Sequence, residues 1–273
     1  MPPGRQAVGM APADRDWRLI AEEARPGAEN MALDVAAAET AADGGPRTLR
    51  LYRWAPSTLS LGYGQAVETV DWEFCDREGI DVVRRPTGGG GIYHDTFGDI
   101  SYSIVLPAEE VPGDLMESYA LLMEPILEAL DRMGVRAETA NEPRPALHEP
   151  ACYLRAIHPA HDVVVGGRKL SGNAQYRQRN AVIQHGSITF ARETERHLGV
   201  FAEPGVTPAE FEERVTSVRA IADIDRAAAV DALERALADW AAAEVDSWTD
   251  AERKRADEIV EDRFADAEWT NRR

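Results

Sequence analysis

The sequence predicts an α+β fold in which a central mixed sheet is flanked by helices. Segments of alternating or continuous apolar residues, typical of strands, are concentrated between positions 48 and 190 of the 273-residue chain. Helical periodicity dominates before and after this region, at residues 28–42 and 224–245. The sequence contains no internal repeat. Strands grouped in the middle and helices at both ends favour an α+β arrangement.

The first elements follow from local patterns. Residues 28–42 predict a helix with Asn30 as its N-cap. Residues 48–54 and 57–64 predict strands, and residues 70–79 predict a short helix that ends at a glycine.

The middle of the chain is built around a glycine-rich loop that joins two strands, residues 80–85 and 99–106. Residues 115–133 predict an amphipathic helix, in which Pro125 is expected to cause a kink or a break. The segment 144–161 contains three prolines and is expected to be irregular.

The remainder is read as three strands followed by helices. Residues 162–190 predict strand, tight turn, strand, turn and strand, with glycines 166–167 in the first turn. An apolar stripe that includes Leu233 predicts a helix over residues 224–245. Thr249 and Glu252 have the spacing of a capping box that opens the last helix.

Residues 1–15 are rich in proline, glycine, alanine and charge, and predict a flexible arm. Residues 16–273 are expected to form a single domain, helical from about position 207, with no accessory domain after it.

Composition excludes several classes of protein. The net charge of −18 argues against a nucleic-acid partner, and no segment resembles a membrane span or a signal peptide. The two cysteines form no disulfide or metal pattern, which favours a reducing cytoplasm. The acidic excess predicts a halophilic protein.

Lysine is scarce in this chain. Of 30 lysines and arginines, only Lys169 and Lys254 are lysines. Lys254 belongs to a charged helical face, whereas Lys169 lies between glycines in GGRKLSGNAQ. A retained lysine indicates a site that needs a compact ammonium, which the planar guanidinium of arginine does not supply.

The stretch RRPTGGGGIYHD, residues 84–95, predicts an anion site. Arg84 and Arg85 are forked donors suited to phosphate, and glycines 88–91 let backbone amides approach a ligand closely. No Lys-Ser/Thr pair follows the glycines, so this is not a P-loop.

Together with GGRKLSGNAQYRQRNAVIQHGS, this stretch resembles the signatures of the lipoate–protein ligase family, whose catalytic domain is shared with biotin protein ligases and octanoyltransferases. ENMALD, STLSLGYGQ and FADAEWTNRR support the resemblance, which covers about residues 17–269.

The resemblance implies a sheet like that of class II aminoacyl-tRNA synthetases and biotin protein ligases. It also implies ATP-dependent activation of lipoate or octanoate to an acyl-adenylate, with ATP bound as its Mg²⁺ complex and no tightly bound metal. Transfer to a lysine of a 2-oxoacid dehydrogenase E2 or glycine-cleavage H protein domain would follow.

In this interpretation Lys169 is catalytic, because its ammonium would touch the acyl carbonyl and the α-phosphate together. Asp162 is a weak candidate for Mg²⁺ through ATP oxygens. The candidate substrate- and nucleotide-binding residues are Arg84, Arg85, Thr87, Gly88, Gly89, Gly90, Gly91, Ile92, Tyr93, His94, Asp162, Ser171, Gly172, Asn173, Ala174, Gln175, His185, Gly186 and Ser187.

Two departures from the family pattern keep alternatives open. His161 stands where many family ligases carry asparagine, and a separate accessory subunit is one explanation for the chain's short C-terminal part. Cys152 lies in the upstream loop that supplies a cysteine nucleophile in one octanoyltransferase branch, which takes octanoyl from acyl carrier protein without ATP. The ligase is the first interpretation and the Cys152-dependent transferase is the alternative. A biotin ligase and a non-catalytic protein that binds an acyl-adenylate or acceptor domain are further alternatives.

Overall fold

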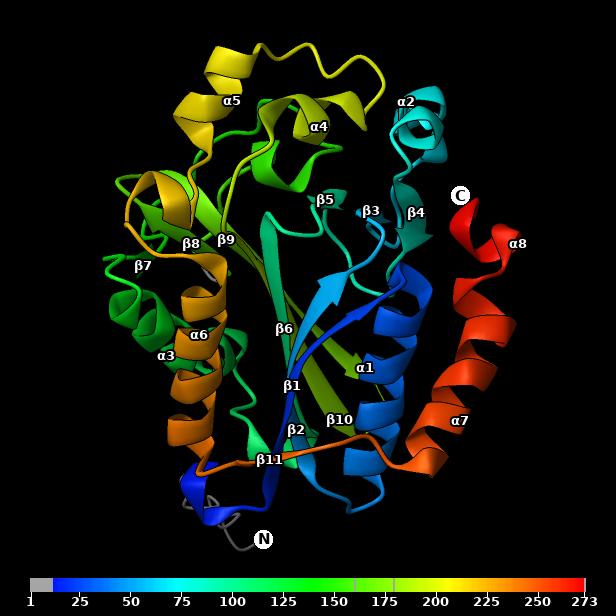
Figure 1. Cartoon of the computed structure of the whole chain (residues 1–273), viewed down its shortest axis with the longest axis vertical. Coiled ribbons are helices and arrows are strands. Elements are labelled where there is room, and N and C mark those ends of the chain that lie inside the picture. Colours follow the sequence, from blue (N-terminus) through cyan, green and yellow to red (C-terminus); the bar gives the residue numbers. More distant parts are fainter. Residues whose placement is uncertain (1–11, 160, 179, 273) are drawn as a thin grey trace, which may run out of the picture.

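The computed structural model describes residues 12–159, 161–178 and 180–272 (Figure 1). It confirms the predicted α+β fold, since an eight-stranded mixed sheet runs through the molecule in the order β11-β1-β2-β6-β10-β9-β8-β7. The strands are β1 (Trp17–Arg25), β2 (Arg47–Trp54), β6 (Asp99–Pro107), β7 (Glu138–Thr139), β8 (Asp162–Val165), β9 (Arg168–Gln178), β10 (Ala181–Thr189) and β11 (Glu244–Asp246).

The sheet is parallel at one edge and antiparallel elsewhere. β1 is parallel to both β2 and β11, because the helix α1 (Gly27–Ala42) forms the crossover between β1 and β2. All the pairings from β2 to β7 are antiparallel. The sequence analysis did not predict β1 or β11.

Helices cover both faces of the sheet (Figure 1). On one face α3 (Leu115–Arg132) packs with α6 (Arg226–Ala241) over a core that includes Leu49, Ile104 and Leu233. On the other face α1 packs with α7 (Asp250–Ile259), and its many alanines allow the close approach to the sheet. The short α8 (Ala267–Thr270) ends the described chain.

A second, three-stranded sheet lies beyond one end of the large sheet (Figure 1). Its central strand β3 (Thr58–Leu61) pairs with β4 (Asp81–Arg84) and with β5 (Ile92–His94). The helices α2 (Trp72–Arg77), α4 (Thr194–Gly199) and α5 (Pro208–Arg214) lie at the same end, and their apolar side chains share one core with the small sheet. The glycine-rich loop therefore connects β4 to β5, and not directly to the strand at residues 99–106 that was expected to follow it.

One local prediction is wrong. The N-cap of α1 is Pro26, and the buried Asn30 amide instead donates to the carbonyls of Arg25 and Arg53. α3 runs as one helix through Pro125 and is not broken in two. Pro12–Asp14 form a 3-10 turn, and the indole of Trp17 donates to the Pro12 carbonyl. Residues 1–11 lie outside the described part, and the flexible arm stays a prediction.

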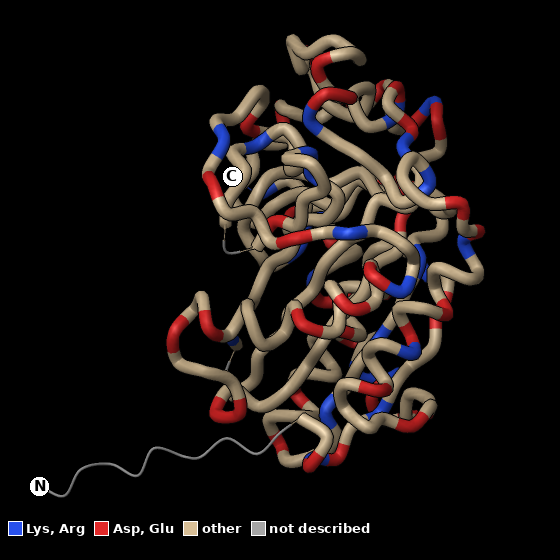
Figure 2. Tube along the Cα trace, turned by 90° about the vertical axis from the view of Figure 1, so that its left-hand side faces the viewer, with Lys and Arg blue, Asp and Glu red and all other residues tan. Residues whose placement is uncertain are grey.

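The acidic excess is spread over the molecule rather than gathered on one face (Figure 2). Aspartate and glutamate occur along nearly all the visible elements, with arginines interspersed among them. None of the described helices combines the length and the apolar character needed to cross a bilayer. Halophily remains a prediction.

Candidate active site

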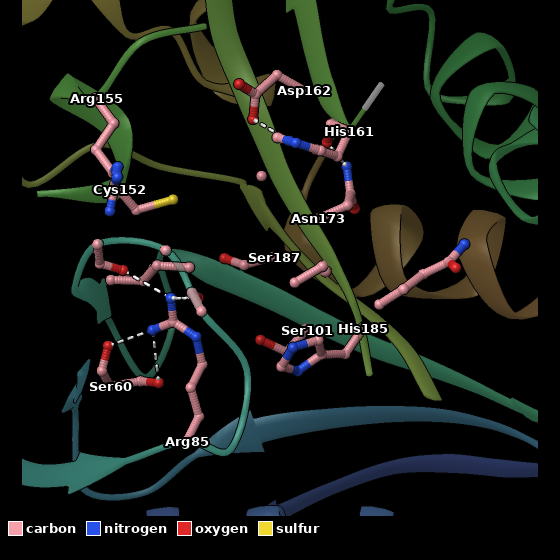
Figure 3. A pocket seen from close by; sticks show the side chains of 18 of the residues that line it. Ser60, Arg85, Ser101, Cys152, Arg155, His161, Asp162, Asn173, His185 and Ser187 are labelled. Carbon is pink, nitrogen blue, oxygen red and sulfur yellow. Dashed lines mark hydrogen bonds and ion pairs between the residues drawn. The ribbon is translucent and has the colours of Figure 1, made fainter. Parts of the chain in front are cut away.

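A cavity of about 250 Å³ lies between the glycine-rich loop, the segment around Cys152 and strands β9 and β10 (Figure 3). Most of the residues selected from the sequence meet here. Those that line it are Arg85, Gly88, Gly89, Gly90, Ile92, His94, Cys152, Asp162, Lys169, Gly172, Asn173, Ala174, Gln175, His185, Gly186 and Ser187. The sequence analysis did not select Tyr52, Ser60, Ser101, Tyr119, Arg155, Ala156 or His161, which also line it.

Lys169 is buried in this cavity by an irregularity in the β8–β9 hairpin. The register shifts between Val163 and Val164, so Asp162 pairs with Gly172 while Val164 pairs with Lys169. A regular strand would place positions 169 and 172 on opposite faces, but the bulge brings both to the face of Asp162. The carboxylate of Asp162 then lies 2.8 Å from Lys169 Nζ, with both side chains at most 4% exposed.

Lys169 and Asp162 each stabilise the charged form of the other. Burial by itself lowers the pKa of Lys169, but the Cys152 and Asp162 charges beside it hold that pKa above its ordinary value. Burial would likewise raise the pKa of Asp162, yet Lys169, the His161 ring and the His158 amide hold it below its ordinary value. Lys169 is therefore a fixed ammonium in the floor of the cavity.

Cys152 lies against this ammonium. Lys169 Nζ donates a hydrogen bond of 3.0 Å to the Cys152 carbonyl and lies 3.7 Å from Cys152 Sγ. A cation this close stabilises a thiolate over a thiol. The sulfur points into the cavity beside Arg155 (Figure 3). Cys75, in contrast, is buried in α2, where burial raises the pKa of its thiol to about 11.

The glycine loop holds the Cys152 segment by backbone pairing. The Gly91 amide donates to the Pro150 carbonyl at 2.6 Å, and the Cys152 amide donates to the Gly91 carbonyl at 2.7 Å. A Cβ on Gly90 would lie 2.8 Å from the Pro150 carbonyl oxygen and 2.9 Å from the Cys152 amide nitrogen. The absence of side chains thus permits a close backbone approach that places the cysteine.

Arg85 supports the loop from within. Its guanidinium donates to the carbonyls of Ser60, Gly88 and Gly90, each at 2.7 Å, and its Nε donates to the Thr87 hydroxyl (Figure 3). Burial lowers its pKa to about 10, so the group remains charged at neutral pH. From the sequence, these donors were expected to face a phosphate. In this structure backbone carbonyls accept their hydrogen bonds instead.

Arg84 lies outside the cavity, although it was expected behind Arg85 at the anion site. Its guanidinium donates to the carbonyls of Gly62, Tyr63, Gln65 and Thr270. The side chain therefore ties the C-terminal segment to the loop that follows β3.

His185 borders both this cavity, called the main cavity below, and a small hollow next to it. Its Nε2 is hydrogen-bonded to the Thr87 hydroxyl at 3.0 Å. Burial and the nearby Arg85 charge lower the pKa of His185 to about 3, so the ring is neutral. The hollow has a volume of only about 10 Å³, and its other bordering residues are Met31, Asp34, Val35, Pro86, Thr87, Tyr176 and Ile183.

The remaining selected residues have structural partners. Tyr93 donates to Asp95 and packs on His197, away from the cavity. His94 lines the cavity, but its Nδ1 is bonded to Asp99 at 2.5 Å. Thr87, Gly91 and Ser171 lie next to lining residues without lining the main cavity themselves. Asn173 accepts from the Tyr102 hydroxyl and donates to the His161 carbonyl at 2.7 Å.

Asp162 was the candidate metal contact. Both its oxygens are already in use, Oδ1 by Lys169 and Oδ2 by the His158 amide at 2.9 Å. Within the described ranges no three histidine, cysteine or acidic side chains come together as a metal site. The carboxylate holds the lysine in place in this structure.

The model of the lipoyl protein ligase A/B catalytic domain matches residues 26–239. The chain belongs to this family. Octanoyltransferase LipM of Kyrpidia tusciae is 36% identical over 94% of this chain and 99% of its own, and octanoyltransferase LipM of Halalkalibacterium halodurans is 31% identical over the same shares. The structure of protein Ta0514, a putative lipoate protein ligase from T. acidophilum with bound lipoic acid, has a TM-score of 0.77 at 24% identity and covers 94% of this chain and 98% of its own.

Membership of the family makes this chain an enzyme of the lipoate ligase and octanoyltransferase group. The sequence analysis placed the ATP-dependent ligase first. The named relatives support its alternative, the octanoyltransferase, better than they support the ligase. Neither ATP binding nor formation of an acyl-adenylate is confirmed.

Proposed function

We propose that this protein is an octanoyltransferase that carries the octanoyl group as a thioester on Cys152. The donor would be octanoyl–acyl carrier protein, and the acceptor a lysine of a lipoyl domain of a 2-oxoacid dehydrogenase or of a glycine-cleavage protein. The observation that carries the proposal is the 3.7 Å separation of Cys152 Sγ and Lys169 Nζ inside the main cavity. A buried cation beside an accessible sulfur is the arrangement that activates a cysteine nucleophile.

The first half-reaction is a thioester exchange. The Cys152 thiolate attacks the carbonyl carbon of the donor thioester, a C–S bond to Cys152 forms, and the C–S bond to the donor breaks. The donor sulfur leaves as a thiolate and takes a proton from water. The Lys169 ammonium stabilises both the attacking sulfur and the negative charge that develops on the carbonyl oxygen.

The second half-reaction forms the product amide. The neutral amine of the acceptor lysine attacks the acyl-Cys152 carbonyl, a C–N bond forms, and Cys152 leaves as a thiolate next to Lys169. The extra proton on nitrogen passes to a base or to water. Neither step consumes ATP, because the donor thioester already carries an activated acyl group.

Two further features fit a transferase better than an adenylating ligase. The Arg85 donors are satisfied by the loop's own carbonyls, and the Asp162 carboxylate is paired with Lys169, so neither is left open for a nucleotide phosphate.

The test uses the whole protein with octanoyl–acyl carrier protein and an unmodified acceptor domain, in the absence of ATP. Octanoyl-amide on the acceptor is the expected product, and Cys152→Ser is expected to abolish it. Cys75→Ser, which removes the other cysteine, should remain active. Octanoate-dependent exchange between ATP and pyrophosphate that persists in Cys152→Ser, with no transfer from the carrier protein, would instead establish the ligase.

A further inference from the structure

The second half-reaction needs a base. A lysine amine has an ordinary pKa of about 10.4, so at neutral pH most acceptor side chains are ammonium ions that cannot attack a carbonyl. Attack also leaves an extra proton on nitrogen, which must be removed as the C–N bond forms. A positioned base supplies roughly 10²–10⁴-fold in such steps.

Lys169 cannot fill this role in its observed state. Its ammonium is held by Asp162 at 2.8 Å and by the Cys152 carbonyl at 3.0 Å, and its pKa is raised. A group that stays protonated stabilises the sulfur and the oxyanion but accepts no further proton.

Three histidines line the cavity, and two of them, His94 and His185, are hydrogen-bonded to other side chains. The His94 ring is bonded to Asp99 and stacked on Trp54 at a centroid distance of 4.1 Å. His185 Nε2 already has the Thr87 hydroxyl as its partner. The His94 side chain is also only 5% exposed, so its ring is less open to an amine arriving from solvent than a partly exposed ring is.

His161 is placed differently. Its side chain is 35% exposed, and its Nδ1 faces Asp162 Oδ1 at 4.0 Å. In the part of the chain that the structure describes, no side chain or backbone group is hydrogen-bonded to its Nε2. The Asn173 amide donates to the His161 carbonyl at 2.7 Å, and Figure 3 shows the two residues side by side. The His161 ring stacks on His158 with centroids 4.4 Å apart.

The carboxylate of Asp162 links this ring to the nucleophile. Oδ1 lies between Lys169 Nζ and His161 Nδ1, and Lys169 in turn contacts Cys152. At 4.0 Å the carboxylate is too far from Nδ1 for a direct hydrogen bond, but its negative charge favours the tautomer in which Nδ1 carries the proton and Nε2 the lone pair.

We propose that His161 is a further catalytic residue, which takes the proton from the acceptor lysine as that lysine attacks acyl-Cys152; this inference rests on the proposed octanoyltransferase function. The imidazole Nε2 lone pair accepts one proton from the bound acceptor ammonium, which leaves a neutral amine that attacks. As the C–N bond forms and the C–S bond to Cys152 breaks, the second proton on nitrogen passes to water. The imidazolium then returns its proton to water, and the Cys152 thiolate is restored.

The experiment separates the two half-reactions in the full-length protein. Acyl-Cys152 is formed with octanoyl–acyl carrier protein and followed by intact mass, and its decay on addition of the acceptor domain is then timed. In His161→Gln we expect acylation within about threefold of the wild-type rate and a transfer to the acceptor about 10²-fold slower. His158→Gln, which alters the stacked neighbour that does not line the cavity, is the matched control and should change transfer by less than about threefold.

The pH dependence gives a readout that a structural role would not move. The groups facing His161 are His158 on the same segment, Asp162 on β8, Lys169 on β9 and Tyr119 on α3. Without the base, transfer depends on the fraction of acceptor lysine that is already a neutral amine in solution, so the rate in His161→Gln should rise about tenfold per pH unit below the lysine pKa, more steeply than in the wild type. Equal pH profiles, or wild-type transfer by His161→Gln, would overturn the proposal. A wild-type protein that forms no acyl-Cys152 would overturn the transferase function itself.

Discussion

The ammonium of Lys169 lies 3.7 Å from the sulfur of Cys152 and donates a hydrogen bond to the carbonyl of the same residue. The two residues are seventeen positions apart and come from a 3-10 turn and a β-hairpin, respectively. Their contact depends on the bulge in β9 and on the backbone pairing of the glycine loop with the cysteine segment. Each of these dependencies can be tested by a single substitution.

Lys169→Arg should reduce octanoyl transfer by at least about 10²-fold, because a planar guanidinium cannot occupy the site of a compact ammonium. The protein should remain folded by circular dichroism. Lys254→Arg, which changes the other lysine on the exposed face of α7, is the control and should be fully active. Full activity of Lys169→Arg would refute the role of a point charge.

Gly172→Ala should separate the nucleophile from the lysine. A Cβ at this position would lie 3.2 Å from Cys152 Sγ and 3.3 Å from Lys169 Cε, both tighter than ordinary contact. We expect a loss of about tenfold or more in the rate of Cys152 acylation, measured in a single turnover. Gly64→Ala, where the added atom meets nothing within 4 Å, should acylate at the normal rate. Equal rates of acylation in the two variants would show that the separation of Cys152 Sγ and Lys169 Nζ does not affect acylation.

Gly90→Ala should displace the Cys152 segment. The added Cβ would come within 3 Å of the Pro150 carbonyl oxygen and the Cys152 amide nitrogen, and neither backbone atom can move alone. Gly88→Ala in the same loop meets no atom within 4 Å and should lose much less. The measurement is alkylation of Cys152 by iodoacetamide together with transfer activity. A glycine loop whose only task is to receive an anion would give similar losses in both variants.

Acid should destabilise the fold through His197. This ring is buried among Tyr93, Tyr153 and Phe211, and burial lowers its pKa to about 4. Between pH 6.5 and 4 the unfolded chain takes up a proton that the folded chain does not, so the free energy of unfolding falls as the pH falls. The loss approaches roughly 3 kcal/mol for this group.

His197→Phe keeps an aromatic ring but removes the titration. Urea unfolding of this variant should therefore show a flatter dependence on pH between 6.5 and 4 than the parent protein. His185, whose pKa is about 3, titrates in the same direction and leaves a residual slope in both proteins. Identical slopes in the two proteins would contradict the assignment to His197.

Much of the fold was predictable because its signals are local. The hairpins of residues 162–190 follow from glycines and alternating apolar residues, and the capping box of Thr249 and Glu252 is present as predicted. β1 was missed because it pairs with partners distant in sequence, and its polar residues do not alternate clearly. Asn30 was misjudged because an N-cap and a buried hydrogen-bonding asparagine look alike in a sequence.

The active site, too, could be predicted from the sequence only where its signals are local. Lys169 stood out because lysine is rare here, and the glycines because they are costly in a regular turn. Which groups the arginines bind depends on where the loop's own carbonyls point, and no residue pattern encodes that. The shared use of Asp162 by Lys169 and His161 arises from a bulge that shifts the strand register. Only the folded backbone reveals it.

The most direct test of this account is the intact mass of the purified protein after brief incubation with octanoyl–acyl carrier protein in the absence of ATP. We predict a gain of one octanoyl group, located on Cys152 by peptide mapping, absent in Cys152→Ser and lost when an acceptor domain is added. A wild-type protein that stays unmodified under these conditions but modifies the acceptor once ATP and octanoate are supplied would contradict it.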